Sequence, residues 1–318
     1  MMRVVVQSLA GQTLEFELDS ETKVSALKSS IASCCDIPPA CQNLLNGTNL
    51  LHDSACLSDC AQSGVPEPQL LSLSLIVSHA ALRQALIDGD TCEKESALAT
   101  LVKLGPKGGE ESVIDVVVGG LEDTSRRIRS SALTALTQLA CKGHDHATQA
   151  LLPRLKHPNY EVRCMAVQAL GQIADVGDKR ALHALIECLG DVSGGVRSAG
   201  AQALPQVAQK GDSAALAALV ACLHDEDRHV RSTAMEVLPK VAQKGNLSVM
   251  AEVVSSLQNK EVDGHLALKA LTNVVEKGDA RAISALTMCL EEACPTLRVE
   301  VLEALTQIAE QGANSVLS

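Results

Sequence analysis

Aromatic side chains are almost absent from this 318-residue chain, which has one Phe, one Tyr and no Trp. Proteins that bind single-stranded nucleic acid stack the bases on aromatic rings. Binding to phosphate backbones also needs clustered Lys and Arg, whereas the formal net charge here is −11. The composition therefore predicts no nucleic-acid partner.

Long apolar runs are also missing. The longest, from Ala214 to Leu223, is too short to span a bilayer. The first residues, "MMRVVVQSLAGQ", lack the longer apolar region of a signal peptide. We therefore expect a protein with no membrane partner, located in the cytoplasm, with the nucleus as a second candidate compartment.

The twelve cysteines have no metal-binding spacing. Cys56 and Cys60 lie four apart, but no second pair completes a zinc-site pattern. Cys188, Cys222 and Cys289 each precede a Leu at the same point of a repeat, which indicates buried thiols. Without export we expect the thiols to be reduced, and we predict neither a metal nor a cofactor.

A repeated sequence organises the second part of the chain. "VAQKGD" begins at Val207 and "VAQKGN" at Val241, 34 residues later. Glycines recur in step, at Gly109, Gly143, Gly177, Gly211, Gly245, Gly278 and Gly312. Such a fixed period is the signature of a repeat array.

Each repeat reads as two helices. Asp212 can cap a first helix, and the apolar positions of "AALAALVACL" then recur on one face. A polar turn, "HDEDRH", separates it from a second helix that ends at Lys244-Gly245, a cation and a glycine suited to a helix C-terminus. One such pair cannot bury its own apolar face, so neighbouring pairs must stack into a solenoid.

Two further features that recur at fixed positions of the repeat identify its type. Asp lies six residues before Arg in several units, and second helices carry patterns such as "VRCMAVQAL". This resembles the short HEAT-like repeats of phycobilin lyase subunits and deoxyhypusine hydroxylase. The resemblance implies a hydrogen-bonded ladder between neighbouring repeats, formed here by Asp123, Arg129, Arg163, Asp191, Arg197, Asp225, Arg231 and Arg298.

The resemblance covers residues 79–318. It implies a degenerate first helical pair at residues 79–108, with Lys94 at the Arg position, followed by about six 34-residue repeats. Gly264 replaces the Arg in a shortened unit.

Residues 1–78 do not contain the repeat and show a different pattern of strands and helix. Alternating residues around Gly11 predict a hairpin, "KVSALKSSIASCC" predicts a helix, and Leu71, Leu73 and Leu75 alternate with serines as a last strand. This order, with "IPP" after the helix and "LSD" further on, resembles ubiquitin-like domains. The fold class we predict is therefore multidomain: an α+β ubiquitin-like (β-grasp) domain, then an all-α HEAT-like solenoid.

The ubiquitin resemblance implies a binding surface. The apolar recognition patch of ubiquitin corresponds here to Leu9, Leu45 and Leu73, with burial in the core as the alternative reading of these residues. Ubiquitin ends in a flexible tail with two glycines, whereas this strand runs through "LSLSLIVSHAALRQ" into the first solenoid helix. We therefore expect a built-in docking module that is not conjugated to other proteins.

A second candidate surface lies on the second helices. One column there is polar in every repeat: Gln138, Gln172, Gln206, Lys240, Asn273 and Gln307. It is either an ordinary solvated face or a row that binds an extended protein segment.

The alternative function is that of an enzyme or enzyme subunit with similar repeats, resembling either a tetrapyrrole lyase or deoxyhypusine hydroxylase, an oxidoreductase. Deoxyhypusine hydroxylase, which has similar repeats, binds iron through His-Glu dipeptides, and none of the nine histidines here is followed by Glu. Phosphate-loop and nucleophile-elbow motifs are also missing. We therefore predict no catalytic residue. The expected function is a protein-interaction adaptor in which residues 1–78 bind a ubiquitin receptor or proteasome component and residues 79–318 bind an unknown client.

Overall fold

The computed structural model describes the whole chain except residues 9–10, 36, 61–69, 259–262, 293–294 and 310–318. The chain divides into two compact units, Met1–Cys141 and Lys142–Ser318. No described helix is both long enough and apolar enough to cross a membrane.

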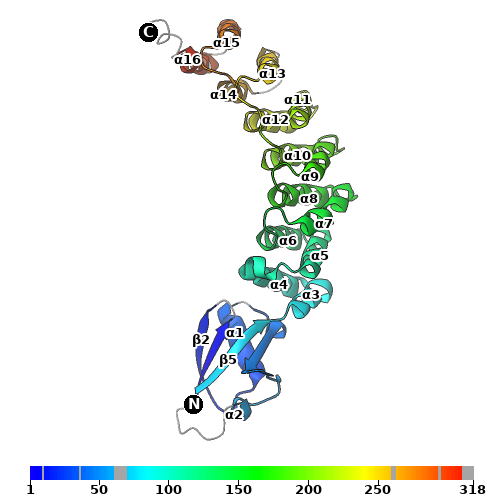
Figure 1. Ribbon diagram of the computed structural model, residues 1–318, viewed down its shortest axis with the longest axis vertical. Coiled ribbons are helices and arrows are strands. Elements are labelled where there is room, and N and C mark those ends of the chain that lie inside the picture. Colours follow the sequence, from blue (N-terminus) through cyan, green and yellow to red (C-terminus); the bar gives the residue numbers. More distant parts are fainter. Residues whose placement is uncertain (9–10, 36, 61–69, 259–262, 293–294, 310–318) are drawn as a thin grey trace. The chain divides into compact units, whose positions relative to one another are not determined.

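The first unit opens with a five-stranded mixed sheet (Figure 1). Its elements are β1 (Met2–Ser8), β2 (Thr13–Leu18), α1 (Val24–Cys35), η1 (Pro39–Cys41), β3 (Gln42–Asn46), β4 (Asn49–Leu50), α2 (Leu57–Cys60) and β5 (Leu70–Val77). The strand order is β2-β1-β5-β3-β4, with β1 parallel to β5 and the other neighbours antiparallel. This is the predicted ubiquitin-like arrangement.

Alternating side chains build the core of this sheet. On β1, Val4 and Val6 are buried, and on β5 the three leucines at 71, 73 and 75 are buried. Helix α1 covers them with Leu27 and Ile31, which are fully buried. The period of 2 in the strands and of 3 to 4 in the helix therefore put both apolar faces into one core.

Strand β5 continues into the first helix of the array without a linker. Ser78 follows Val77 directly, donates its N–H to the Cys41 carbonyl and caps helix α3 by accepting a hydrogen bond from Ala81 N at 3.2 Å. Lys103 Nζ, on α4, donates to the carbonyl of Cys35 at 2.9 Å. The sheet domain and the first helical pair are therefore joined by direct contacts within one unit.

Helical pairs make up the rest of both units. The first unit continues with α3 (His79–Asp88), α4 (Thr91–Leu104), η2 (Gly105–Gly108), α5 (Glu111–Gly119), η3 (Gly120–Glu122) and α6 (Arg126–Leu139). The second contains α7 (Asp145–Leu151), η4 (Leu152–Lys156), α8 (Tyr160–Ile173), α9 (Lys179–Cys188), α10 (Gly194–Val207), α11 (Ser213–Cys222), α12 (Arg228–Val241), α13 (Leu247–Gln258), α14 (Gly264–Val274), α15 (Ala280–Glu292) and α16 (Pro295–Ala309).

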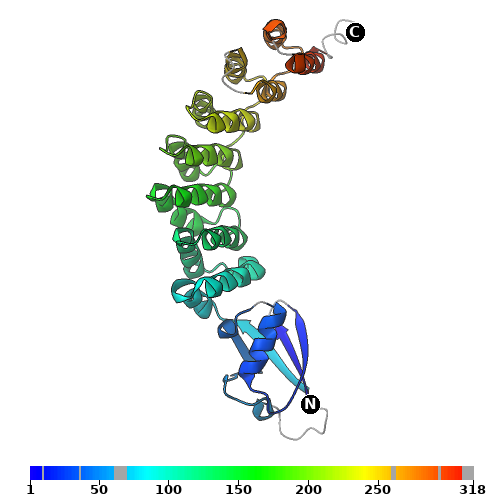
Figure 2. The ribbon, with the colours of Figure 1, turned by 180° about the vertical axis from the view of Figure 1, so that it is seen from behind.

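In the second unit the two helices of each pair form two layers. The second helices α8, α10 and α12 lie side by side in one layer (Figures 1 and 2). The first helices α9 and α11 form the other layer and pack against these second helices. This is the stacking predicted for an α-solenoid, in which each repeat buries its apolar face against its neighbours.

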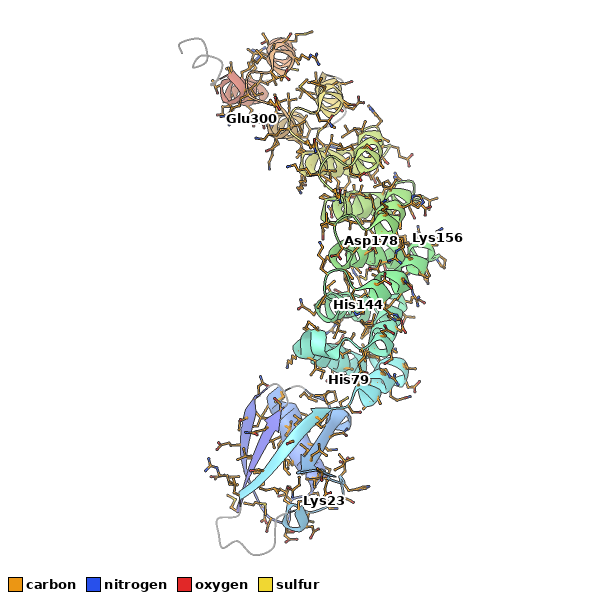
Figure 3. All side chains as sticks on the ribbon, in the orientation of Figure 1. Lys23, His79, His144, Lys156, Asp178 and Glu300 are labelled. Atoms are coloured by element: carbon orange, nitrogen blue, oxygen red, sulfur yellow. The ribbon has the colours of Figure 1, made fainter. Side chains whose placement is uncertain are left out.

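The caps of the first helices follow the predicted chemistry. Asp212 accepts a hydrogen bond from Ala215 N at 2.9 Å. His144 and Asp178 cap α7 and α9 in the same way (Figure 3). An oxygen or ring nitrogen at these positions satisfies backbone N–H groups that have no partner within the helix.

The recurring glycine lies in the turn that follows each second helix. Gly211 has a φ of +87°, which residues with a Cβ rarely adopt, and its N–H donates to the Val241 carbonyl of the next repeat at 2.7 Å. The glycines at 143, 177, 245 and 278 make the equivalent bond, each to the end of the following second helix. The prediction that the second helix ends at Lys244-Gly245 is wrong, because α12 ends at Val241 with the extended Ala242 as its C-cap. The recurring glycine instead marks a backbone contact between repeats.

Candidate functional site

Buried ion pairs connect neighbouring repeats. Arg163 donates from Nε and Nη2 to the two carboxylate oxygens of Asp191, at 2.8 and 2.7 Å. Arg197 makes the same paired contact with Asp225, also at 2.8 and 2.7 Å. In the first unit Lys94 takes this role and contacts Asp123 at 2.9 Å. These contacts form the inter-repeat ladder that the HEAT resemblance implied.

Arg197 and Asp225 each also make hydrogen bonds within the inter-helix turn of their own repeat. Arg197 Nη1 donates to the carbonyls of Asp191 and Val192. Asp225 accepts the N–H of Asp227 at 2.8 Å. One Arg–Asp pair therefore closes the inter-helix turns of two successive repeats, which explains why these residue types recur at this spacing.

The pairs shift the ionisation of their carboxylates. Hydrogen bonds from Arg197 lower the pKa of Asp225 below its usual value. Burial raises the pKa of Asp191, but the hydrogen bonds from Arg163 and from Ser193 N outweigh it and the net shift is downward. Both carboxylates are therefore ionised at neutral pH.

The other predicted ladder residues differ in their contacts. Arg129 and Arg231 donate to two carbonyls of their own turns, as Arg163 and Arg197 do. Arg298 is exposed near the start of α16. After Arg129 the Asp position of the next repeat holds His157, so no carboxylate follows it in the ladder. For Arg231 and Arg298 the contact to a following carboxylate stays a prediction.

One substitution in the ladder has a physical explanation. His157 stands where other repeats have Asp, and its Nδ1 accepts the N–H of Asn159 at 3.1 Å. A ring nitrogen thus replaces the carboxylate oxygen in holding the turn, provided that Nδ1 carries no proton.

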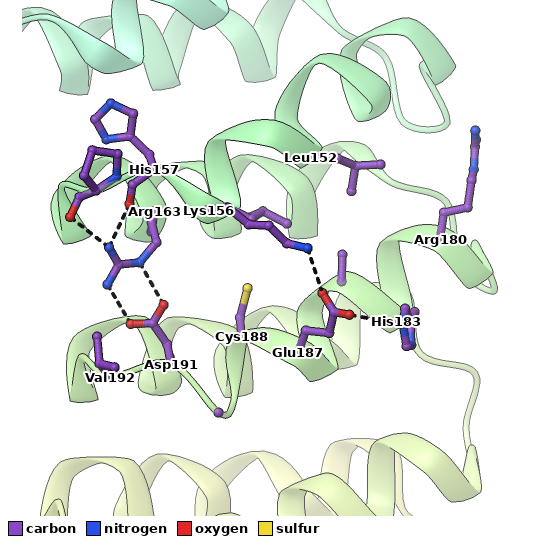
Figure 4. Close-up of a pocket in the computed structure, with 14 residues that line it drawn as sticks. Leu152, Lys156, His157, Arg163, Arg180, His183, Glu187, Cys188, Asp191 and Val192 are labelled. Carbon is purple, nitrogen blue, oxygen red and sulfur yellow. Dashed lines mark hydrogen bonds and ion pairs between the residues drawn. The ribbon is translucent and has the colours of Figure 1, made fainter.

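A groove of about 760 Å³ opens beside the Arg163–Asp191 pair, between η4 and α9 (Figure 4). At its other side Glu187 contacts Lys156 at 3.8 Å and His183 at 3.3 Å. The thiol of Cys188 lies between these two groups, and burial raises its pKa to about 12. A thiol with this pKa is not a nucleophile at neutral pH.

The predicted polar column is exposed along its length. Gln138, Gln172, Gln206, Lys240, Asn273 and Gln307 are all solvent-exposed, each on the second helix of its repeat. Asn273 donates to the Lys269 carbonyl of its own helix, and Lys240 pairs with Glu236 at 3.0 Å. The column is therefore a solvent-exposed face of the second helices. Its binding role stays a prediction.

The structure corrects the predicted apolar patch on the sheet. Leu73 is only 2% exposed and packs in the core, so the prediction that it belongs to a surface patch is wrong. Leu45 is half-buried, and its partner on β5 is Ser74. Leu50, which pairs with Leu45 from β4, is 62% exposed. Leu9 lies outside the described residues. The apolar surface on this part of the sheet is therefore Leu45 with Leu50.

Comparison with known families agrees with both parts of the fold. Residues 4–64 match the ubiquitin family, and residues 114–205 match HEAT repeats. The chain carries a ubiquitin-like domain followed by HEAT-like repeats. No curated protein matches the chain. The ubiquitin-like domain and the HEAT-like repeats are both of the kind that mediates protein–protein interaction.

The described parts of the chain offer ionic, polar and apolar groups. The ladder carboxylates are ion-paired with arginines, the glutamines of the column offer amide donors and acceptors, and Leu45 and Leu50 offer a small apolar surface. Among the described residues no three His, Cys, Asp or Glu side chains gather as a metal-binding group.

Proposed function

We propose that the protein is a non-catalytic adaptor. Its ubiquitin-like domain binds a ubiquitin receptor or a ubiquitin-binding component of the proteasome, and its HEAT-like repeats hold a client protein. The observation that carries this proposal is the junction at Ser78, where the last strand of the ubiquitin-like domain becomes the first helix of the array.

The junction favours docking over conjugation. A ubiquitin that modifies other proteins needs a free C-terminal tail, and here the equivalent residues are occupied by the Ser78 cap and helix α3. The contact between Lys103 and Cys35 ties the domain to the array at a second point. A ubiquitin-like domain fixed in this way supports a permanent docking module.

The surface proposed for the receptor is Leu45 with Leu50. The half-buried Leu45 and the exposed Leu50 are paired neighbours on the sheet, and apolar side chains grouped at a surface are a common feature of protein-binding sites. Ser74 makes the β5 side of this surface more polar than three leucines would. We therefore place the apolar contact on β3 and β4.

The surface proposed for the client is the polar column of the second helices. Glutamine amides both donate and accept hydrogen bonds, so they suit the backbone of an extended segment. Because the column recurs once per repeat, successive repeats offer the same groups along the array.

Paired affinity purification tests both surfaces with the full chain. The baits are the unaltered protein, Leu45→Ser, and the triple variant Gln172→Ala, Gln206→Ala, Lys240→Ala. We expect Leu45→Ser to lose proteasome subunits or ubiquitin receptors and to keep the client, and the triple variant to do the reverse. If both variants recover the same proteins as the unaltered chain, neither surface has the proposed role.

A further inference from the structure

Strand β2 forms an open edge of the ubiquitin-like sheet. It is the first strand in the order β2-β1-β5-β3-β4, and it is six residues long (Figure 1). The opposite edge strand, β4, has only two residues. Strand β2 is therefore the edge that is long enough to accept another strand.

The hydrogen-bond register shows which backbone groups face outward. The Ser8 N–H donates to the Gln12 carbonyl at 2.8 Å, which makes this a hydrogen-bonded pair of the β1–β2 hairpin. Bonded and non-bonded pairs alternate in an antiparallel ladder. Thr13, Glu15 and Glu17 fall in the non-bonded pairs, so their N–H and C=O groups point away from β1. In the described sheet β2 has β1 as its only neighbour, and no backbone bond from a described turn or loop reaches these three residues.

The side chains of β2 alternate in the same way. Thr13, Glu15 and Glu17 are exposed, whereas Leu14, Phe16 and Leu18 lie at the margin of the core and are only half-buried. The corresponding core positions on β1 and β5 are at most 3% exposed. An added strand would therefore cover apolar surface that the sheet leaves partly open.

The charge at this edge is negative. Glu15 pairs with Arg3 of β1 at 2.6 Å, with both side chains more than half exposed, and Glu17 stands opposite the same arginine. The surrounding domain is acidic as well, because residues 1–78 contain eight Asp and Glu but three Lys and Arg. Opposite charges that face each other across two strands stabilise their pairing.

We propose that the β2 edge binds an extended segment of a partner protein with alternating basic and apolar residues. Its backbone pairs with Thr13, Glu15 and Glu17, its basic side chains face the two glutamates, and its apolar side chains cover Leu14, Phe16 and Leu18. This is recognition by strand addition, with backbone bonds providing affinity and alternate side chains providing specificity. It goes beyond the adaptor proposal, because it uses a different edge of the sheet from Leu45 and Leu50.

The probe is a labelled seven-residue peptide of alternating lysine and valine, titrated onto the full chain and followed by fluorescence anisotropy. We expect saturable binding that weakens as salt rises. A peptide of alternating glutamate and valine is expected not to bind. Equal binding of the two peptides would contradict the proposal.

Three single variants locate the site. Glu15→Pro removes an outward N–H without removing a β1–β2 bond, so we expect it to abolish binding. Glu15→Gln keeps that N–H and removes one charge, which should weaken binding about two- to fivefold, the size of one exposed charge pair. Glu21→Gln makes the same charge change beyond the strand and should leave affinity unchanged. Equal weakening by the two glutamine variants would show non-specific attraction and overturn the proposal.

A further measurement does not depend on how Glu15→Pro folds. The same peptide with N-methyl groups on alternate residues keeps its charges but cannot donate along one edge. We expect it to lose binding to the unaltered protein when the methylated edge is the one facing β2. If peptides methylated on either edge bind as well as the parent, the contact is not strand addition and the glutamates only protect the edge from other strands.

Discussion

Arg197 and Asp225 lie 28 residues apart in the sequence and share two hydrogen bonds, Nε to Oδ2 at 2.8 Å and Nη2 to Oδ1 at 2.7 Å. Their side chains are only 9% and 12% exposed. Arg163 and Asp191 repeat the relationship one repeat earlier. The interface between successive repeats is therefore specified by paired charges at a fixed spacing, in addition to apolar packing.

Arg197→Ala should destabilise the interface between these repeats. Removing one partner leaves a nearly buried carboxylate without its cation, which costs about 3 kcal/mol. Chemical denaturation of the full chain, followed by far-ultraviolet circular dichroism, measures the change. As a control, Arg180→Ala removes an arginine that pairs with Asp145 while more than half exposed, and it should have a much smaller effect. Similar losses for the two variants would show that the ladder adds no particular stability.

Stability should fall in acid through the ladder carboxylates. Hydrogen bonds from Arg197 lower the pKa of Asp225 in the folded protein, while the unfolded value is about 3.9. The stabilisation is therefore fully present above the unfolded pKa and is lost as the pH falls through the lower, folded pKa. The free energy of unfolding, measured between pH 6 and pH 3, should decline less steeply for Asp225→Asn. If the free energy of unfolding falls equally steeply with pH in the variant and in the unaltered protein, Asp225 does not cause the loss of stability in acid.

Gly211→Ala should destabilise its repeat by about 1–2 kcal/mol, because an alanine at a φ of +87° is strained. A Cβ there would also lie 2.7 Å from Nε2 of Gln243. Gly119 is the matched control, since it ends helix α5 and a Cβ there meets nothing within 4 Å. Gly119→Ala should be neutral or slightly stabilising. Thermal unfolding of both variants distinguishes the two cases, and equal melting temperatures would contradict this explanation of the glycine column.

The buried thiols should be inert in the native protein. Burial raises the pKa of Cys188 to about 12 and of Cys222 to about 11, so at pH 7.5 only on the order of one Cys222 thiol in a few thousand is ionised. Alkylation with iodoacetamide, read by mass spectrometry, should modify the exposed Cys92 and Cys141 first. Cys188 and Cys222 should react only after denaturation. Labelling of all four at similar rates would show that these repeats open readily.

The sequence predicted those elements whose pattern is local. Alternation over Leu71, Leu73 and Leu75 predicted β5, and the helical spacing of Val24, Leu27 and Ile31 predicted α1. The same alternation also indicates why the patch prediction failed. Residues two apart lie on the same face of a strand, so Leu71, Leu73 and Leu75 all face the core. The serines between them lie on the opposite face, and Ser74 is therefore the residue of β5 beside Leu45.

Contacts between repeats were only partly predictable. The Arg–Asp ladder followed from a family resemblance, whereas the bond from Gly211 N–H to the Val241 carbonyl has no side-chain signal. From the sequence, glycine at that position indicates a helix end, whereas α10 ends earlier, at Val207. The capping role of the neighbouring Asp212 was visible because a side chain performs it. Backbone bonds between stacked repeats depend on the stacking geometry, which no single repeat encodes.

Docking by the ubiquitin-like domain is the central claim, and one affinity comparison tests it most directly. Purified proteasomes are titrated onto the immobilised full chain, its Leu45→Ser variant, and Leu70→Ser, which removes another exposed leucine from a different place on the sheet. We expect binding by the unaltered chain and by Leu70→Ser, and at least a tenfold loss for Leu45→Ser. Equal affinity for all three, or no binding by any, would contradict docking to the proteasome through this surface.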